Sequence, residues 1–254
     1  MTVRPPLLEG RRVSKSFGGL AALTDVDLTV HTGDVVGIVG PNGSGKTTLF
    51  DCVTGMEEID EGRVFFKGCD ITHRRPSQVA RMGLSRTFQG IRVYRKLTVM
   101  DNMLLSRQWG DRGWLSVLRP SHPRVTERAN GLLDFVTLLP QRAELAGSLS
   151  WGQQRLLEIG MALMSDPDLL LLDEATSGVN PTLVDAISDR IVTLNQAHGK
   201  TIVLIEHNID LVADLCDRVV VFDHGEKLAE GGVGAVFEDP VVIEAYFGGR
   251  GLDA

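Results

Sequence analysis

The chain contains 254 residues, of which 43% are hydrophobic and 23% are charged, as in an ordinary soluble globular protein with one large α/β domain or two small ones. Its formal net charge of -7 excludes a generally basic surface and argues against nucleic acid as the principal partner. No apolar run approaches the roughly 18 residues that a membrane-spanning helix needs, so we expect any membrane crossing to be made by another chain.

Two strands joined by a turn are predicted at the start of the chain. They cover residues 7–16 and 23–30, with apolar residues alternating in the second and a turn at Gly18 and Gly19. Phe17 ends the first strand, just upstream of a glycine-rich loop, where an aromatic ring could stack on a purine base. On its position alone, a place in the core is the better interpretation of Phe17.

The glycine-rich loop follows an apolar strand predicted over 35–39 and leads into a helix that ends near Gly55. The loop and the residue after it are Gly40, Pro41, Asn42, Gly43, Ser44, Gly45, Lys46, Thr47 and Thr48. Strand, loop and helix in this order predict a P-loop, in which backbone N–H groups and the helix N-terminus surround nucleotide phosphates. Lys46 would reach the β- and γ-phosphates, and the Thr47 hydroxyl would bind Mg²⁺. The alternative is a glycine-rich turn that matches by chance.

The segment after this helix alternates between strands and a short helix. Strands are predicted over 61–68 and 84–89, with a helix over 76–82 between them. Gln89 ends the second strand and, taken alone, indicates no more than a surface glutamine.

The three cysteines, Cys52, Cys69 and Cys216, are scattered and form no CxxC pair. This spacing predicts reduced thiols rather than disulfides or a zinc site. Cys52 and Cys216 lie in predicted elements and are expected to be packing residues.

Helical periodicity takes over after residue 90. Amphipathic helices are predicted over 98–105 and 127–139, separated by an irregular stretch that carries Trp109 and Trp114. These tryptophans lie near basic residues and could mark a protein contact or the membrane surface, or they could form a small satellite core.

A further helix is predicted from Ser150 to about residue 164. Leu156, Ile159 and Leu163 give it one apolar face, and Ser150 is well placed as its N-cap. Spacing alone indicates only a capped helix.

Two acidic residues, Asp173 and Glu174, follow four consecutive leucines at 169–172. Such a run predicts a strand buried on both faces of a parallel sheet, and ligands bind beyond the carboxyl ends of such strands. Asp173 suits Mg²⁺, and Glu174 suits the polarisation of an attacking water. A chance acidic strand end is the weaker alternative.

The last third of the chain again alternates helices and strands. A strand over 201–205 ends in Glu206 and His207, and this histidine could hydrogen-bond a γ-phosphate, although an isolated histidine is more often in the core or on the surface. The other predicted elements are helices over 182–197, 208–216 and 239–247, and a hairpin of strands over 218–222 and 226–229.

Together these residues resemble the ATP-binding subunit of an ABC transporter over nearly the whole chain. The matching motifs are Walker A at 40–47, Walker B at 169–173 with the catalytic glutamate Glu174, the signature motif at 149–154, the Q-loop at Gln89, the D-loop at 177–180 and the switch histidine His207. The resemblance implies an α/β P-loop NTPase (RecA-like) core, an N-terminal antiparallel β subdomain and an inserted α-helical subdomain. Within one ABC ATPase domain, 1–254, it divides the chain into a core over 1–89 and 160–238, a helical subdomain over 90–159 and a C-terminal tail over 239–254.

The resemblance also implies ATP and Mg²⁺ as cofactors and a role for each matching residue. The implied catalytic residues are Glu174, His207 and Lys46, and the implied metal ligands are Thr47, Gln89 and Asp173. The residues implied to bind ATP are Phe17, which would stack the adenine, the loop from Gly40 to Thr48, Gln89, Ser150, Gly152 and Gln153. Ser150 and Gly152 would complete the site of a second subunit, so the resemblance implies a head-to-tail dimer.

Three residues depart from the commonest motifs: Trp151 replaces Gly in the signature, Ala175 replaces Pro after the glutamate, and Asn180 replaces Asp in the D-loop. An aromatic residue at the first of these places is similar to the branched-chain amino-acid branch of the family, the LivG-like ATPases. Further segments similar to that branch are 16–23, 86–92, 97–99 and 243–248, together with the tryptophan-bearing insertion.

This branch implies an ATP hydrolase that energises import of branched-chain amino acids or a similar small polar solute. Implied partners are transmembrane permease subunits, a second ATP-binding subunit (an identical chain or a LivF-like sister) and, indirectly, an extracytoplasmic solute-binding protein, with no nucleic acid. The implied location is peripheral, on the cytoplasmic face of the inner or plasma membrane. The segment 90–97, with Arg92, Tyr94, Arg95 and Lys96, is the expected permease-docking surface.

Other classes stay open at this point. Within ABC systems they are a urea or amide importer and a lipopolysaccharide-type exporter. A soluble non-transport ABC ATPase would be expected to bring two ATPase halves or a long coiled coil, and neither is visible. A regulatory module without turnover would be expected to lack Glu174 or His207, and both are present.

Overall fold

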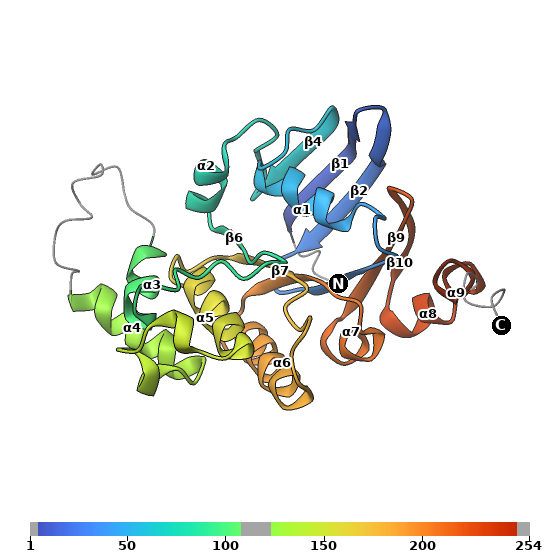
Figure 1. The fold of residues 1–254 in the computed structure, drawn as a ribbon. Coiled ribbons are helices and arrows are strands. Elements are labelled where there is room, and N and C mark those ends of the chain that lie inside the picture. Colours follow the sequence, from blue (N-terminus) through green and yellow to red (C-terminus); the bar gives the residue numbers. More distant parts are fainter. Residues whose placement is uncertain (1–4, 108–122, 248–254) are drawn as a thin grey trace.

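Two β-sheets form the framework of the protein (Figure 1). The structure is a computed structural model that describes residues 5–107 and 123–247. Trp109 and Trp114 lie outside the described residues. The first sheet has four strands in the order β2-β1-β4-β5 and is antiparallel. Its strands are β1 (Pro6–Phe17), β2 (Leu20–His31), β4 (Glu61–Phe66) and β5 (Cys69–Asp70).

The second sheet has six strands in the order β10-β9-β3-β8-β7-β6. All neighbours are parallel except the hairpin of β9 and β10, as the sequence predicts for the C-terminal part of the chain. Its strands are β3 (Val35–Val39), β6 (Leu84–Arg86), β7 (Leu169–Asp173), β8 (Thr201–Ile205), β9 (Arg218–Asp223) and β10 (Glu226–Gly231).

Helices cover both faces of the six-stranded sheet. In Figure 1 the four-stranded sheet and α1 lie above it, and the helices from α5 to α7 lie below it. The α-helices are α1 (Lys46–Thr54), α2 (Pro76–Arg81), α3 (Val99–Leu105), α4 (Pro123–Phe135), α5 (Trp151–Leu163), α6 (Pro181–Gln196), α7 (Ile209–Leu215), α8 (Val233–Phe237) and α9 (Pro240–Phe247). Short 3₁₀ turns at Leu139–Gln141 and Ala146–Ser148 connect α4 to α5.

The core has two parts because successive side chains of a strand point to opposite faces. In β7, Leu170 and Leu172 pack into the cluster with the helices α3 to α7. Leu169 and Leu171 pack into the other cluster, with α1 and the four-stranded sheet. The four leucines are therefore buried on both faces, as their uninterrupted run predicts.

Three predictions about individual elements are wrong. The strand expected over 84–89 ends at Arg86, because the carbonyls of Phe88 and Gln89 bind a buried arginine instead of a neighbouring strand. The helix expected over 127–139 ends at Phe135, and Thr137 has a φ of 61°, a left-handed conformation that stops a helix. Phe17 is not a core residue, since 44% of it is exposed.

Cys52 and Cys216 are buried, as predicted, whereas Cys69 is exposed. Burial raises the pKa of the Cys52 and Cys216 thiols to about 12, so neither forms an appreciable amount of thiolate at pH 8. We expect a maleimide at pH 8 to label Cys69 alone in the native protein and all three thiols after unfolding, as measured by intact mass. Rapid labelling of Cys52 in the folded chain would contradict this.

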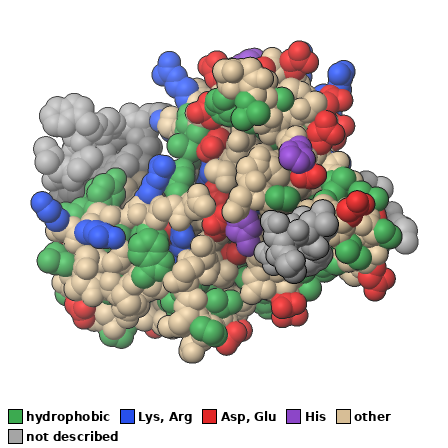
Figure 2. All heavy atoms as spheres, turned by 45° about the vertical axis from the view of Figure 1, so that its right-hand side comes forward, with side chains coloured by type: hydrophobic (Ala, Val, Ile, Leu, Met, Phe, Trp, Pro, Cys, Tyr) green, Lys and Arg blue, Asp and Glu red, His purple; other side chains and the backbone are tan. Residues whose placement is uncertain are grey.

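Charged side chains of both signs lie on the face shown in Figure 2, where the described Lys and Arg side chains are more frequent on the left and Asp and Glu side chains on the right. The Lys and Arg side chains do not form one continuous stripe. Histidine side chains on this face lie at the top of the molecule and near its centre.

Candidate nucleotide-binding site

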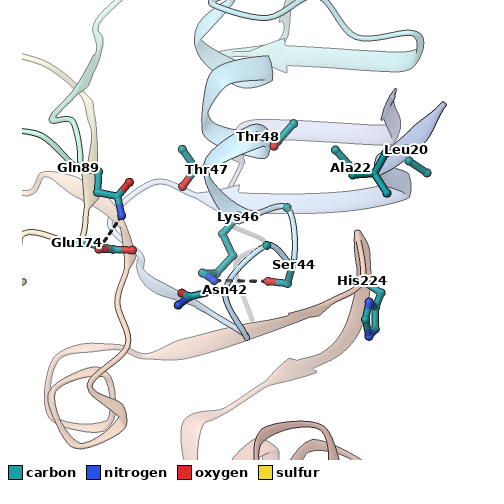
Figure 3. Close-up of a pocket in the computed structure, with 13 residues that line it drawn as sticks. Leu20, Ala22, Asn42, Ser44, Lys46, Thr47, Thr48, Gln89, Glu174 and His224 are labelled. Carbon is teal, nitrogen blue, oxygen red and sulfur yellow. Dashed lines mark hydrogen bonds between the residues drawn. The ribbon is translucent and has the colours of Figure 1, made fainter. Parts of the chain in front are cut away.

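A cavity of about 590 Å³ opens beyond the carboxyl ends of the parallel strands. Its lining combines the loop after β3 with two side chains from other elements, Gln89 and Glu174, which meet there (Figure 3). The lining residues are Leu20, Ala21, Ala22, Asn42, Gly43, Ser44, Gly45, Lys46, Thr47, Thr48, Gln89, Glu174 and His224. This position is the one at which ligands bind in open α/β sheets.

Lys46 is the first residue of α1 and lies inside the loop that precedes the helix. Its Nζ donates to the carbonyl oxygens of Gly40 and Pro41, each at 2.8 Å, and lies 3.5 Å from the Ser44 hydroxyl (Figure 3). Burial lowers the pKa of Lys46, and the carboxylates of Glu174 and Asp173 oppose that shift. A buried cation surrounded by inward-facing backbone is a favourable place for the phosphates of a nucleotide.

Glycine is required in this loop for two separable reasons. Gly43 and Gly45 both have left-handed φ angles, of 80° and 98°. A Cβ on Gly45 would lie 2.4 Å from the carbonyl oxygen of Ala22, whereas a Cβ on Gly43 would meet nothing within 4 Å. Gly45 is therefore confined by the neighbouring strand β2 as well as by its own conformation.

We expect Gly45→Ala to lower the melting temperature by several degrees more than Gly43→Ala, because both substitutions strain φ but only the first collides with backbone. A left-handed non-glycine residue costs about 1–3 kcal/mol, and the collision adds to that. Calorimetry on the two variants measures the difference, and equal melting temperatures would contradict a close approach at Gly45.

Asp173 is fully buried at the end of β7. Its Oδ2 accepts a hydrogen bond from Arg86 at 2.8 Å, and the other arm of that guanidinium binds Asp51 of α1 at 2.6 Å. Burial raises the pKa of Asp173, and Arg86 opposes the shift. Its other oxygen, Oδ1, has no hydrogen-bond partner.

The oxygen atoms near the loop fit a magnesium ion. An unpartnered buried carboxylate oxygen on Asp173 and a hydroxyl on Thr47 are both hard ligands. Within residues 5–107 and 123–247 no three His, Cys, Asp or Glu side chains cluster as a metal cage. Mg²⁺ at nucleotide sites needs none, because phosphates and water supply most of its ligands.

Glu174 is held from both sides by residues that the sequence singles out. Its Oε2 accepts a hydrogen bond from Gln89 Nε2 at 3.1 Å, and its Oε1 lies 2.8 Å from His207 Nε2. The backbone of Glu174 has a φ of 48°, which is unusual for a residue other than Gly, Asn or Asp. Strained backbone that fixes a carboxylate at a cavity wall is typical of a functional residue.

The predicted signature residues lie elsewhere. Ser150 caps α5: its hydroxyl accepts from Gln153 N at 3.3 Å, and Gln153 Oε1 accepts from Ser150 N at 3.0 Å. Ser150, Gly152 and Gln153 do not line the cavity. Trp151 beside them is 48% exposed, so this helix start faces solvent in the single chain.

The structure places some, but not all, of the predicted site residues around one cavity. Lys46, Thr47, Thr48, Gln89 and Glu174 line one cavity. Phe17 is absent from the lining, and Lys15 Nζ lies 5.2 Å from the centre of its ring.

Sequence reasoning missed His224 and Arg86. His224 lies in the β9–β10 turn and reaches the cavity only through the fold. In the sequence, the one feature that could have singled out Arg86 is its position three residues before Gln89.

A glycine loop between a strand and a helix, a buried lysine inside it and a pair of acids at the carboxyl end of β7, a parallel strand of the same sheet, define a P-loop nucleoside triphosphatase. A family model described as "ABC transporter" matches residues 23–177.

Curated relatives and solved structures agree with that class. The probable branched-chain amino acid transport ATP-binding protein LivG of Archaeoglobus fulgidus is 37% identical over 248 residues, with 96% of each chain covered. The high-affinity branched-chain amino acid transport ATP-binding protein LivG of Escherichia coli K12 is 36% identical over 250 residues, covering 96% of this chain and 98% of that one. A crystal structure of the ADP conformation of an ABC-transporter ATP-binding cassette superposes with a TM-score of 0.86 at 37% identity, covering 96% of this chain and 99% of that one.

The chain therefore belongs to the ABC transporter ATP-binding family, and the resemblance predicted from its motifs is confirmed. Its fold is that of the ATP-binding cassette, and its activity is ATP hydrolysis coupled to transport. Among the helices described here, none is long and apolar enough to span a membrane. A transport ATP-binding subunit implies membrane permease subunits as partners.

Proposed function

We propose that this chain binds Mg-ATP in the loop cavity and hydrolyses it to energise import of branched-chain amino acids or a similar small polar solute. The observation that carries the hydrolytic part is Glu174, held between Gln89 and His207 at the wall of the phosphate cavity. The names of the relatives, which are 36–37% identical over 96% of the chain, support the solute class.

The predicted site residues in and around the cavity have separate roles in this proposal. Lys46 and the loop N–H groups hold the phosphates, while Thr47, Gln89 and Asp173 hold Mg²⁺, which supplies charge neutralisation when bound. Glu174 accepts a proton from the water that attacks the γ-phosphorus, as the bond between that phosphorus and the β–γ bridging oxygen breaks to release ADP and phosphate.

His207 and Gln89 also fix the orientation of the Glu174 carboxylate. Their hydrogen bonds to its two oxygens leave the side chain little rotational freedom. A positioned general base needs this restriction because misalignment of the proton acceptor sharply reduces catalysis.

The cavity is half of a complete site in this proposal. Ser150, Gly152 and Gln153 lie at a solvent-facing helix N-terminus outside their own cavity, and such a terminus favours anionic ligands. They would bind the nucleotide of a second ATP-binding subunit, either an identical chain or a LivF-like sister, in a head-to-tail dimer. Adenine stacking by Phe17 belongs to the same proposal and is served by its exposed ring.

The remaining partners follow from a transport role. The chain would dock on the cytoplasmic face of the membrane as a peripheral subunit, with a solute-binding protein acting indirectly from the other side. The segment 90–97 is the proposed docking surface: Tyr94 is 59% exposed, and Arg92 packs over the ring of Phe88, next to Gln89.

Purification of the native complex tests this assignment. We expect the tagged chain to copurify with permease subunits whose reconstituted transport of leucine, isoleucine or valine requires ATP. A photocrosslinker placed at Tyr94 should label a permease subunit, with Val241 on α9, which is 56% exposed, as the matched position that does not. Copurification with permeases that carry an unrelated solute would refute the solute class and leave ATP hydrolysis intact.

A further inference from the structure

Arg155 and Glu158 form an ion pair in the interior of the protein. They lie one turn apart on α5, with Arg155 completely buried and Glu158 only 5% exposed, and the guanidinium Nη1 lies 2.8 Å from Oε2. Burying two charges costs free energy that their attraction often does not recover. The pair is therefore explained less by stability than by what else it binds.

The arginine binds the backbone of two separate segments that meet at one wall of the nucleotide cavity. Its Nη1 donates to the carbonyl of Phe88 at 2.7 Å, and its Nη2 donates to the carbonyl of Gln89 at 2.9 Å and to that of Glu174 at 3.4 Å. One guanidinium thus ties together the two residues whose side chains meet at the cavity wall. Its rigid planar fork is suited to several acceptors at once.

The glutamate binds the same segment from the other side. Its Oε1 accepts from the backbone N–H groups of Phe88 and Arg92, each at 3.4 Å. The segment 88–92 is therefore fixed at both ends by α5. Its bent course after β6 depends on side chains rather than on a neighbouring strand.

The same helix begins with the residues that are proposed above to face a second subunit. Gly152 and Gln153 belong to the first turn of α5, and Arg155 follows in the next. Figure 1 shows α5 packed below the sheet beside β6 and β7, with β6 and α3 in direct contact with it. Movement of the N-terminus of α5 would be transmitted to Gln89 and Glu174 through Arg155 and Glu158. This buried pair cannot rearrange without exposing an unpaired charge.

We propose that Arg155 and Glu158 are positioning residues that couple the signature end of α5 to Gln89 and Glu174, so that contact with a second subunit sets the alignment of the hydrolytic carboxylate. This inference rests on the roles proposed above for those two residues. Neither member of the pair lines the cavity, so neither is expected to contact ATP.

The principal test is the double variant Arg155→Met with Glu158→Leu in the full chain. Replacing a buried ion pair by apolar residues of similar size is often neutral for stability, but the backbone groups of Phe88, Gln89 and Arg92 lose their partners, so the variant is expected to stay folded with a lower melting temperature. Its Kd for Mg-ATP should stay within about threefold of the parent, while kcat falls on the order of 100-fold, the effect of a small misalignment at a reacting centre.

Arg128→Met is the matched control. Arg128 also binds α5 through backbone carbonyls, those of Leu163 and Met164, but at the opposite end of the helix from the signature residues. Arg128→Met is expected to keep kcat within about twofold of the parental value, even if the melting temperature falls. A merely structural role for the buried pair would give both variants the same pattern.

Combination with Glu174→Gln shows whether the pair acts through the carboxylate. If it does, adding the double substitution to Glu174→Gln lowers kcat no further, because residues that act as a unit are not additive. A multiplicative loss, or a parental kcat in the double variant, would overturn the proposal. A parental rate in Glu174→Gln itself would refute the proposed hydrolytic role instead.

A second variant covers failure of the double variant to fold. Arg155→Lys keeps a cation for Glu158 but lacks the planar fork that reaches Phe88, Gln89 and Glu174 together. We expect it to fold, to bind Mg-ATP with parental affinity and to lose at least tenfold in kcat. A folded Arg155→Lys chain with parental kcat would overturn the proposal.

Discussion

Glu174→Gln is expected to lower kcat for ATP hydrolysis by about 10²- to 10⁴-fold, the contribution typical of a positioned general base. The substitution keeps the size of the side chain, and its amide can still bond to Gln89 and His207, which now hold the carboxylate at 3.1 and 2.8 Å. Only proton acceptance is lost. Binding of Mg-ATP should therefore survive, since Lys46 and the loop are untouched.

Two measurements on the same preparation check this prediction. Titration with a fluorescent ATP analogue gives the Kd, which we expect to change by less than about threefold, and release of phosphate gives kcat. Glu206→Gln is the control, because Glu206 is also a buried acid that follows a parallel strand, but its Oε1 binds the backbone N–H of Thr176. Near-parental hydrolysis by Glu174→Gln would remove this residue from the proposed role.

Local patterns in the sequence predict the parts of the site that one segment forms by itself. The order of strand, glycine loop and helix places Lys46 and Thr47 correctly, because backbone conformation near a loop depends on its own residues. The cap at Ser150 is predicted for the same reason, and the structure confirms it. Four leucines in a row predict β7 because a strand buried on both faces is a nearly continuous apolar run.

Contacts between distant segments are not visible in this way. Arg86 binds Asp173 across 87 positions, and Arg155 binds the carbonyls of Phe88 and Gln89 across 67 and 66. A buried arginine has no periodic signature, because it replaces one residue of an otherwise apolar face. For this reason the sequence predicts a strand up to Gln89, whereas β6 ends at Arg86.

Gln89 and His207 show where the resemblance to a family was needed. Each looks unremarkable alone, a glutamine after a strand and a histidine at a strand end. Their significance is geometric, since both side chains converge on Glu174 from separate strands of one sheet. The order of the six motifs predicts that convergence, while hydrophobic periodicity does not.

Lys46→Met is expected to raise the Kd for Mg-ATP by about 10²- to 10⁴-fold. Hydrogen bonds to charged groups contribute about 1.5–3 kcal/mol each, and loss of the contacts to two phosphates at tenfold per 1.4 kcal/mol gives this range. Methionine fills much of the same buried volume, so a large cavity is not created.

The structure adds a reason why the loop itself should respond. Lys46 Nζ binds the carbonyl oxygens of Gly40 and Pro41, so it holds the loop curled around the cavity before any ligand arrives. Loss of that cation leaves the loop carbonyls without their donor. The variant should therefore show faster backbone hydrogen exchange over 40–45 as well as weaker binding.

Titration with a fluorescent ATP analogue measures the affinity, and Lys200→Met provides the control. Lys200 is a partly buried lysine that binds Asp166 at 2.9 Å, far along the chain from the loop, and its loss should leave the Kd unchanged. A parental Kd in Lys46→Met, with the loop still protected from exchange, would show that the phosphates are held elsewhere. The cavity after β3 would then no longer be the ATP site.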